Sequence, residues 1–160
     1  MTQAKFIPWK SRLSKIIKQP GGTTVRGALK DAKRNLEQIR RDCIAEIDAK
    51  LGLIQQAFGQ AQTRPSDDEL DALYRLSNDI VGMAGVFDMA ELGEAAFSLC
   101  ELLDRLKGSD QWDRPAVEVH LSALALLRRA TPGAPENQDV LKGLRKLTAR
   151  VDARKELRKA

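Results

Sequence analysis

Residues able to do covalent chemistry are few in this chain, and they are scattered. There is one histidine, His120, and there are two cysteines, Cys43 and Cys100, all far apart in the sequence. A zinc site needs clustered cysteines and histidines, and a nucleophilic enzyme needs a base paired with its nucleophile, so neither is indicated. We expect both cysteines to be small core residues, and we expect neither a cofactor nor a metal.

The densest group of carboxylates is Asp67, Asp68, Glu69 and Asp71. Paired carboxylates can act as acid and base, but these stand where the N-terminus of a helix attracts negative charge. The sequence also has no glycine-rich phosphate loop and no nucleophile elbow. It therefore indicates a protein that is not an enzyme.

On a helix, His120 would lie about 40° from a predicted apolar stripe that contains Val117 and Leu121. We expect it to be partly buried, as a structural residue with one hydrogen-bonded ring nitrogen. Leu124 stands four residues later on the same face of the helix, so we expect it to hinder access to the ring.

The composition predicts an all-α fold. Of the 160 residues, 42% are hydrophobic, 31% are charged and only 4% are aromatic, a mixture typical of amphipathic helices. No apolar run approaches the length of a membrane span and no signal peptide is recognisable, so we expect a cytoplasmic protein.

Helical spacing of the apolar residues and the Pro and Gly breaks divide the chain into five predicted helices. Short loops between them favour an up-down antiparallel bundle in one domain, residues 24–160. The first helix is longer than such a bundle needs, so one end of it should project or pair with a second subunit. The predicted helices cover about 24–62, 66–87, 89–107, 113–130 and 136 onward.

Residues 1–23 form a predicted flexible basic arm that ends at a Pro-Gly-Gly break. Trp9 and Leu13 share helical spacing with Ile16, between basic residues. One interpretation is contact of residues 5–18 with a membrane surface or an acidic partner. The favoured interpretation is a tail that is loose or docks on its own bundle.

The net charge of +5 conceals an uneven distribution. Residues 1–62 carry 12 basic and 5 acidic residues, residues 63–113 carry 4 and 12, and residues 114–160 carry 11 and 5. Nucleic-acid binders usually interleave basic residues with stacking aromatic residues, which this chain does not do beyond its first ten residues. Nucleic acid is therefore not favoured as a partner.

The second predicted helix has an unusual outer side. Leu70, Leu73, Ser77 and Ile80 mark its buried stripe, whereas two glycines fall on the opposite side. An exposed glycine inside a helix costs about 1 kcal/mol relative to alanine, so an open backbone surface for a partner is one explanation. Fraying or a kink of the helix, or close packing of a neighbouring helix, are the alternatives. The predicted partner-binding residues are Asp71, Arg75, Asn78, Asp79, Gly82, Gly85 and Val86.

The stretch from Asn78 to Phe87, with Leu92 and Glu101 after it, resembles the histidine phosphotransfer (HPt) domain of bacterial phosphorelays. The pattern of that family is a histidine, a spacer, an apolar residue, lysine, glycine, a small residue and alanine, followed by an apolar residue and a leucine in the next helix. Five positions match in order, and the HPt-like core would span about 66–157. They are Ile80, Gly82, Ala84, Phe87 and Leu92.

Two positions depart from the pattern of the family. Asn78 stands at the phosphoacceptor histidine and Val81 at the lysine that helps to neutralise the phosphoryl group. The lone pair of an amide nitrogen is delocalised into the carbonyl, so Asn78 cannot accept a phosphoryl group as imidazole does. The resemblance therefore implies a degenerate member of the family.

The leading hypothesis is a two-component signalling protein that binds a response-regulator receiver domain or a histidine kinase without carrying phosphate. It would act as an adaptor or a regulator. One alternative is a helical scaffold that forms a homodimer through residues 24–62. The other is an active phosphotransfer protein that uses His120.

Overall fold

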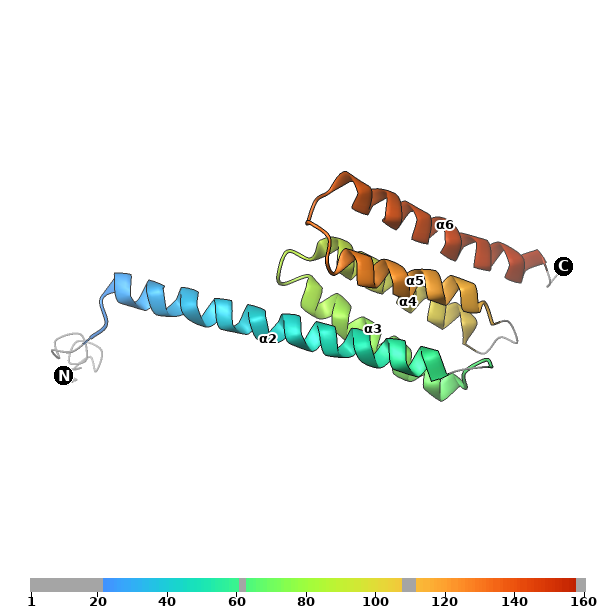
Figure 1. Cartoon of the computed structure of the whole chain (residues 1–160), viewed down its shortest axis with the longest axis horizontal. Helices are drawn as coiled ribbons and strands as arrows, with labels where there is room; N and C mark the ends of the chain where they lie inside the picture. Colours follow the sequence, from blue (N-terminus) through green and yellow to red (C-terminus); the bar gives the residue numbers. More distant parts are fainter. Residues whose placement is uncertain (1–21, 61–62, 108–111, 158–160) are drawn as a thin grey trace, which may run out of the picture. The chain divides into compact units, whose positions relative to one another are not determined.

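The computed structural model of the chain describes residues 22–60, 63–107 and 112–157, with side chains as far as residue 151. These residues form α-helices and no strand, which confirms the predicted all-α class (Figure 1). None of the described helices is both long enough and apolar enough to cross a membrane. The helices are α2 (Val25–Gln60), α3 (Asp67–Ala84), α4 (Ala90–Leu106), α5 (Arg114–Leu127) and α6 (Pro135–Leu157).

The chain divides into two compact units, residues 1–39 and 40–160, and the division falls inside α2. In the first unit α2 begins after Thr24, whose hydroxyl oxygen accepts the N–H of Gly27 at 3.1 Å. The predicted arm over residues 1–23 lies outside the described residues, except for its last two.

Local signals in the sequence set several helix ends where they are predicted. The Ser66 hydroxyl accepts the Glu69 N–H at 3.3 Å and the Glu69 carboxylate accepts the Ser66 N–H at 2.7 Å, which is a complete capping box. The Asp113 carboxylate accepts the N–H of Ala116 at 3.1 Å, and Pro115 lies in the first turn of α5. These caps satisfy backbone donors that the first turn of a helix leaves without partners.

The end of α3 differs from the prediction. The helix ends at Ala84 instead of continuing to about Phe87, so Gly85 and Val86 follow the helix and do not lie within it. Here the N–H groups of residues 86 and 87 bond to carbonyls three residues back, at 3.2 and 3.4 Å, which tightens the turn. Asp88 then adopts a positive φ of 57°, a conformation that Asp tolerates better than most residues. This turn leads into α4.

α4 is the helix that holds the second unit together. It packs against α3, α5 and α6, and α5 also packs against α6. Its buried residues include the neighbouring pair Ala95 and Ala96, both 0% exposed, which point in different directions on a helix. Because both side chains are small, helices can approach α4 closely from more than one side. The other buried residues of α4 are Leu92, Ser98, Leu99, Cys100, Leu102, Leu103 and Leu106.

The second part of α2 joins the same core. Its buried residues Ile47, Leu51, Ile54 and Phe58 belong to one hydrophobic cluster with those of α3, α4 and α5. The ring of Phe58 lies 6.4 Å from the Trp112 ring, and the Arg114 guanidinium lies 4.5 Å from the centre of the Phe58 ring. This cation–π contact joins the end of α2 to the beginning of α5.

Buried polar side chains link α4, α5 and α6. His120 is 0% exposed, and its Nδ1 lies 2.8 Å from the Ala116 carbonyl oxygen. A carbonyl only accepts, so Nδ1 carries the proton and Nε2 of the neutral ring accepts from the Ser98 hydroxyl at 3.0 Å. Ser98 Oγ also lies 3.2 Å from Thr148 Oγ1, and the Thr148 hydroxyl donates to Leu144 O at 3.0 Å. His120 is thus more buried than predicted, and both ring nitrogens have partners.

We predict that acid destabilises the fold through His120. Burial of the ring lowers its pKa below the ordinary value of 6.5, although the bond to the Ala116 carbonyl opposes this. The unfolded chain then binds more protons than the folded chain as the pH falls below 6.5, so the free energy of unfolding should decrease there. For a single proton the slope cannot exceed about 1.4 kcal/mol per pH unit. Urea unfolding at several pH values between 7 and about 5 measures this slope. The range lies above the pH at which carboxylates usually titrate.

The control for this prediction is His120→Gln, which retains a buried polar side chain that cannot titrate. The slope of the wild type should exceed that of the variant. Equal slopes would mean that the folded protein takes up the proton without a penalty.

Candidate functional site

The predicted partner-binding residues lie on α3 and on the turn after it, and we call this set the α3 strip. Asp71 is half-buried and the other members are exposed. Among the described residues, nothing therefore covers this surface against a partner. That a partner binds there stays a prediction. The members of the α3 strip are Asp71, Arg75, Asn78, Asp79, Gly82, Gly85 and Val86.

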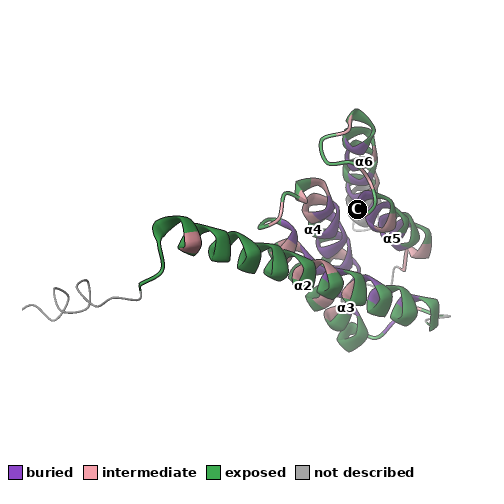
Figure 2. Ribbon diagram, turned by 60° about the vertical axis from the view of Figure 1, so that its left-hand side comes forward, coloured by how far each residue is buried: buried purple, intermediate pink, exposed green. Residues whose placement is uncertain are grey.

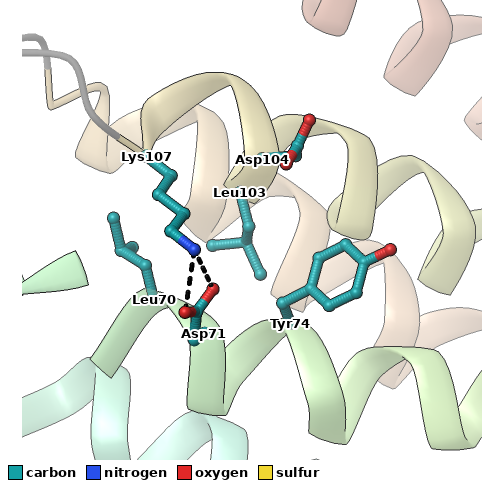
Figure 3. A pocket seen from close by; sticks show the side chains of 6 residues that line it. All are labelled: Leu70, Asp71, Tyr74, Leu103, Asp104 and Lys107. Atoms are coloured by element: carbon teal, nitrogen blue, oxygen red, sulfur yellow. Dashed lines mark hydrogen bonds and ion pairs between the residues drawn. The ribbon is translucent and has the colours of Figure 1, made fainter. Parts of the chain in front are cut away.

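The first end of the α3 strip lies beside a small pocket between α3 and α4 (Figure 3). Lys107 Nζ reaches both carboxylate oxygens of Asp71, at 2.7 and 2.8 Å. This hydrogen bond raises the pKa of Lys107 above its ordinary value. Asp71 is thus engaged by its own chain, and a partner would meet a paired carboxylate here. The pocket is lined by Leu70, Asp71, Tyr74, Leu103, Asp104 and Lys107.

The centre of the α3 strip borders a second, shallow depression formed by α2 and α3. Lys50 of α2 pairs with Asp79 at 2.8 Å and with Glu46 at 3.2 Å. The hydrogen bond to Asp79 raises the pKa of Lys50, and the bond to Glu46 adds to this, so Lys50 stays charged at neutral pH. The depression is lined by Glu46, Lys50, Asn78, Asp79, Gly82 and Met83.

Besides Arg75 of the α3 strip, a second cation in this region comes from a residue that the sequence did not single out. Val81, at the lysine position of the HPt pattern, is half-buried and packs against the hydrophobic core. Lys50 supplies a positive charge beside Asn78 instead, from another helix 28 residues earlier in the chain. No spacing rule connects these two residues, because only the packing of α2 and α3 brings them together.

The glycines of the α3 strip have open surroundings. A Cβ atom added to Gly82 would meet no atom within 4 Å, and one added to Gly85 would meet only backbone oxygens of α3, at 3.8 Å or more. Neither glycine is therefore needed for close packing between helices. Gly93 of α4 is different, since its Cβ would come within 3.3 Å of the Ala84 Cβ. The close approach of α3 and α4 thus depends on Gly93.

Two aromatic side chains that the sequence did not indicate are exposed on α3 and α4. Tyr74 is 39% exposed on α3 and Phe97 is 55% exposed on α4. Cys100 Sγ lies 3.8 Å from the Tyr74 carbonyl oxygen, so Cys100 and Gly93 both face α3, and Phe97 stands between them on α4. Aromatic residues are enriched at protein interfaces. The packing of α3 on α4 thus leaves one aromatic side chain of each helix exposed.

Two of the groups capable of covalent chemistry, His120 and Cys100, are buried inside the protein. Burial raises the pKa of the Cys100 thiol to about 11, so it is hardly ever a thiolate at neutral pH. Cys43 is only half-buried, less buried than the predicted core position. Among the described residues no group of three acidic, histidine or cysteine side chains could hold a metal ion.

Comparisons of the chain with protein-family models, with curated proteins and with solved structures gave no match. The HPt resemblance therefore depends on the residues of this chain alone.

We predict opposite effects on stability for two glycine substitutions. Gly82→Arg should be neutral or stabilising by up to about 1 kcal/mol, because arginine is a better helix former and a cation favours the last turn of a helix. Gly93→Arg should destabilise by about 1–3 kcal/mol, because its side chain must enter the contact between α3 and α4. Urea unfolding of both variants measures this. A destabilised Gly82→Arg would show that Gly82 serves the fold.

Proposed function

We propose that this protein is a degenerate member of the HPt class of two-component signalling proteins. It binds a response-regulator receiver domain or a histidine kinase through the α3 strip and carries no phosphoryl group itself. In this proposal the second part of α2, with α3, α4 and α5, forms the up-down antiparallel bundle of the class. The protein acts in the cytoplasm as an adaptor or a regulator.

The burial pattern of the HPt-like stretch supports the proposal. Ile80 and Ala84, which match apolar and small positions of the pattern, are both 0% exposed, and Leu92, its leucine on the next helix, is 2% exposed. Asn78 and Gly82 are exposed. The pattern of the class requires this combination, with the phosphoacceptor position outside and the apolar positions inside.

The chemistry of Asn78 is the reason for proposing binding without transfer. Its amide resembles an imidazole ring in having a donor and an acceptor, but it has no nucleophilic nitrogen. A partner surface that recognises the phosphoacceptor position can therefore contact Asn78 without reacting with it. Such a protein would compete with active HPt domains or hold a receiver domain in place.

The single observation that carries the proposal is the open backbone at Gly82, one helical turn after Asn78. With no atom within 4 Å of its Cβ position, a partner can approach α3 as closely as the backbone allows. Interfaces derive much of their affinity from such well-packed central contacts.

We predict that Gly82→Arg weakens binding of a receiver domain at least about tenfold, because a long charged side chain would fill the centre of the contact. Isothermal titration calorimetry against purified receiver domains and kinase domains measures it. The matched control is Gly52→Arg on α2, which introduces the same charge at an exposed helical glycine that also has no atom within 4 Å. Gly52 lies on the other flank of α2 from Lys50, about 200° round the helix.

Unchanged binding in folded Gly82→Arg would exclude the α3 strip as the binding surface. Absence of binding to any receiver or kinase domain would exclude the proposal and favour the helical scaffold.

We also predict that Asn78→His makes the protein accept a phosphoryl group, because it places an imidazole at an exposed site beside Lys50. The test is incubation with a phosphorylated kinase or receiver domain, followed by detection of a label that is labile in acid and stable in base. Wild type and Asn78→Gln should stay unlabelled.

The wild type is an informative control in that experiment because its histidine is buried. Label on the wild type that disappears in His120→Ala would establish the alternative of transfer through His120. Such a result would require the buried ring to become exposed and to break its bonds to Ser98 and Ala116.

A further inference from the structure

The first unit carries an apolar surface that the α3 strip does not explain. Val25, Leu29, Leu36 and Ile39 of α2 are 79, 58, 60 and 50% exposed, and Ala32 is exposed as well (Figure 2). Their spacing of four, three, four and three residues is the a/d repeat of a coiled coil. We call these five residues the α2 stripe.

The two flanks of the α2 stripe differ in charge. At about 100° per residue, Arg26 and Lys33 lie about 80–100° from the centre of the stripe on one flank, which corresponds to the e positions of the heptad. Ala28 and Asn35 occupy the corresponding g positions on the other flank, and Asp31 lies beyond them. At the e and g positions that border the stripe, one flank is therefore basic and the other is neutral. Farther round the helix, Glu37 lies beyond the basic flank, and Asp31 on the other side pairs with Arg34 at 3.1 Å.

We propose that the α2 stripe binds an amphipathic helix of another protein whose own apolar stripe is bordered by acidic residues. In a coiled coil, the charges at e and g select the partner and its direction. Acidic residues on the partner would pair with Arg26 and Lys33 while its apolar residues cover Leu29 and Leu36. This surface is separate from the α3 strip.

The charge pattern does not suit a second copy of the chain. An antiparallel pair would bring Arg26 and Lys33 of the two copies together, so like charges would face each other. A parallel pair would set Lys33 opposite Ala28, which offers no charge. Neither arrangement provides partners for the basic flank.

A lipid surface also fits less well. Helices that lie on membranes have a wide apolar face with basic residues around it. The α2 stripe spans only about 80° of the helix, as a coiled-coil seam does. Its second flank has the uncharged residues Ala28 and Asn35 at the g positions, so an anionic surface would meet basic residues beside the stripe on one side only.

The test uses two synthetic helical peptides of three heptads with leucine at every a and d position, one with glutamate and the other with lysine at every e and g position. Fluorescence anisotropy of labelled peptide with the full chain measures binding. We expect the glutamate peptide to bind at least about tenfold more tightly than the lysine peptide. Glutamate side chains attract the basic flank, whereas lysine side chains repel it.

Charge reversal separates specific pairing from general attraction. Arg26→Glu combined with Lys33→Glu should abolish or invert the preference between the peptides. The matched control is Lys146→Glu with Arg150→Glu on α6, which changes the net charge of the chain equally and should keep the preference.

The apolar part has its own pair of variants. Leu36→Gln should weaken binding of the glutamate peptide at least about tenfold. Leu126→Gln on α5 is the control, because Leu126 is similarly exposed, at 55%, outside the α2 stripe. Gly82→Arg should leave peptide binding unchanged, so failure of this proposal and failure of receiver binding can be told apart.

Three results would overturn the proposal. Equal affinity for the two peptides would exclude charge selection by the basic flank. Sedimentation of the chain as a dimer that Leu36→Gln converts to a monomer would identify a second copy as the occupant. Binding to phosphatidylserine vesicles that Leu36→Gln abolishes, without a preference between the peptides, would identify a lipid surface.

Discussion

Burial of α4 on more than one side is the constraint on which the rest of the second unit depends. The sides of α4 that face α3, α5 and α6 must be nearly apolar, and any polar group buried there must find a partner inside the protein. Ser98 is the polar residue that α4 buries, and its partners His120 and Thr148 come from α5 and α6. One hydroxyl group thus helps to set how two further helices pack on α4.

The same constraint determines which side of α3 faces outward. Gly93 lets α4 approach α3 so closely that Ala84 is fully buried, and Ile80 lies in the core one turn earlier. Once this side of α3 is buried, Asn78 and Gly82 must lie outside. The surface proposed to bind a receiver domain is therefore a consequence of core packing.

Ion pairs from two neighbouring helices frame that surface. Lys50 of α2 holds Asp79 on one flank, and Lys107, directly after α4, holds Asp71 near the other. Ion pairs at the surface contribute little to stability, because solvent and salt screen them. The pair of Lys50 and Asp79 does restrain two side chains that line the same depression as Asn78, which reduces the entropy that a partner must remove on binding. The basic flank of the α2 stripe belongs to the first unit, so the two proposed binding surfaces differ in chemistry.

The sequence by itself determined the all-α class, the five helices and several of their ends, because these depend on local rules. Capping by Ser66 and Asp113 and the spacing of apolar residues act over a few residues, and such signals can be read directly. The burial of Ile80 opposite Asn78 follows from the same helical period. The end of α3 at Ala84 was missed, because the turn at Asp88 that leads into α4 outweighs the helical pattern that runs on to Phe87.

Only the tertiary structure decided what surrounds each side chain. Lys50 beside Asn78 and His120 bonded to Ser98 combine residues from different helices. Sequence periodicity shows which face of a helix is apolar, but it does not show which helix packs there or how closely. The open space at Gly82 and the tight contact at Gly93 illustrate this, because the same residue type on neighbouring helices has opposite surroundings for reasons of packing alone.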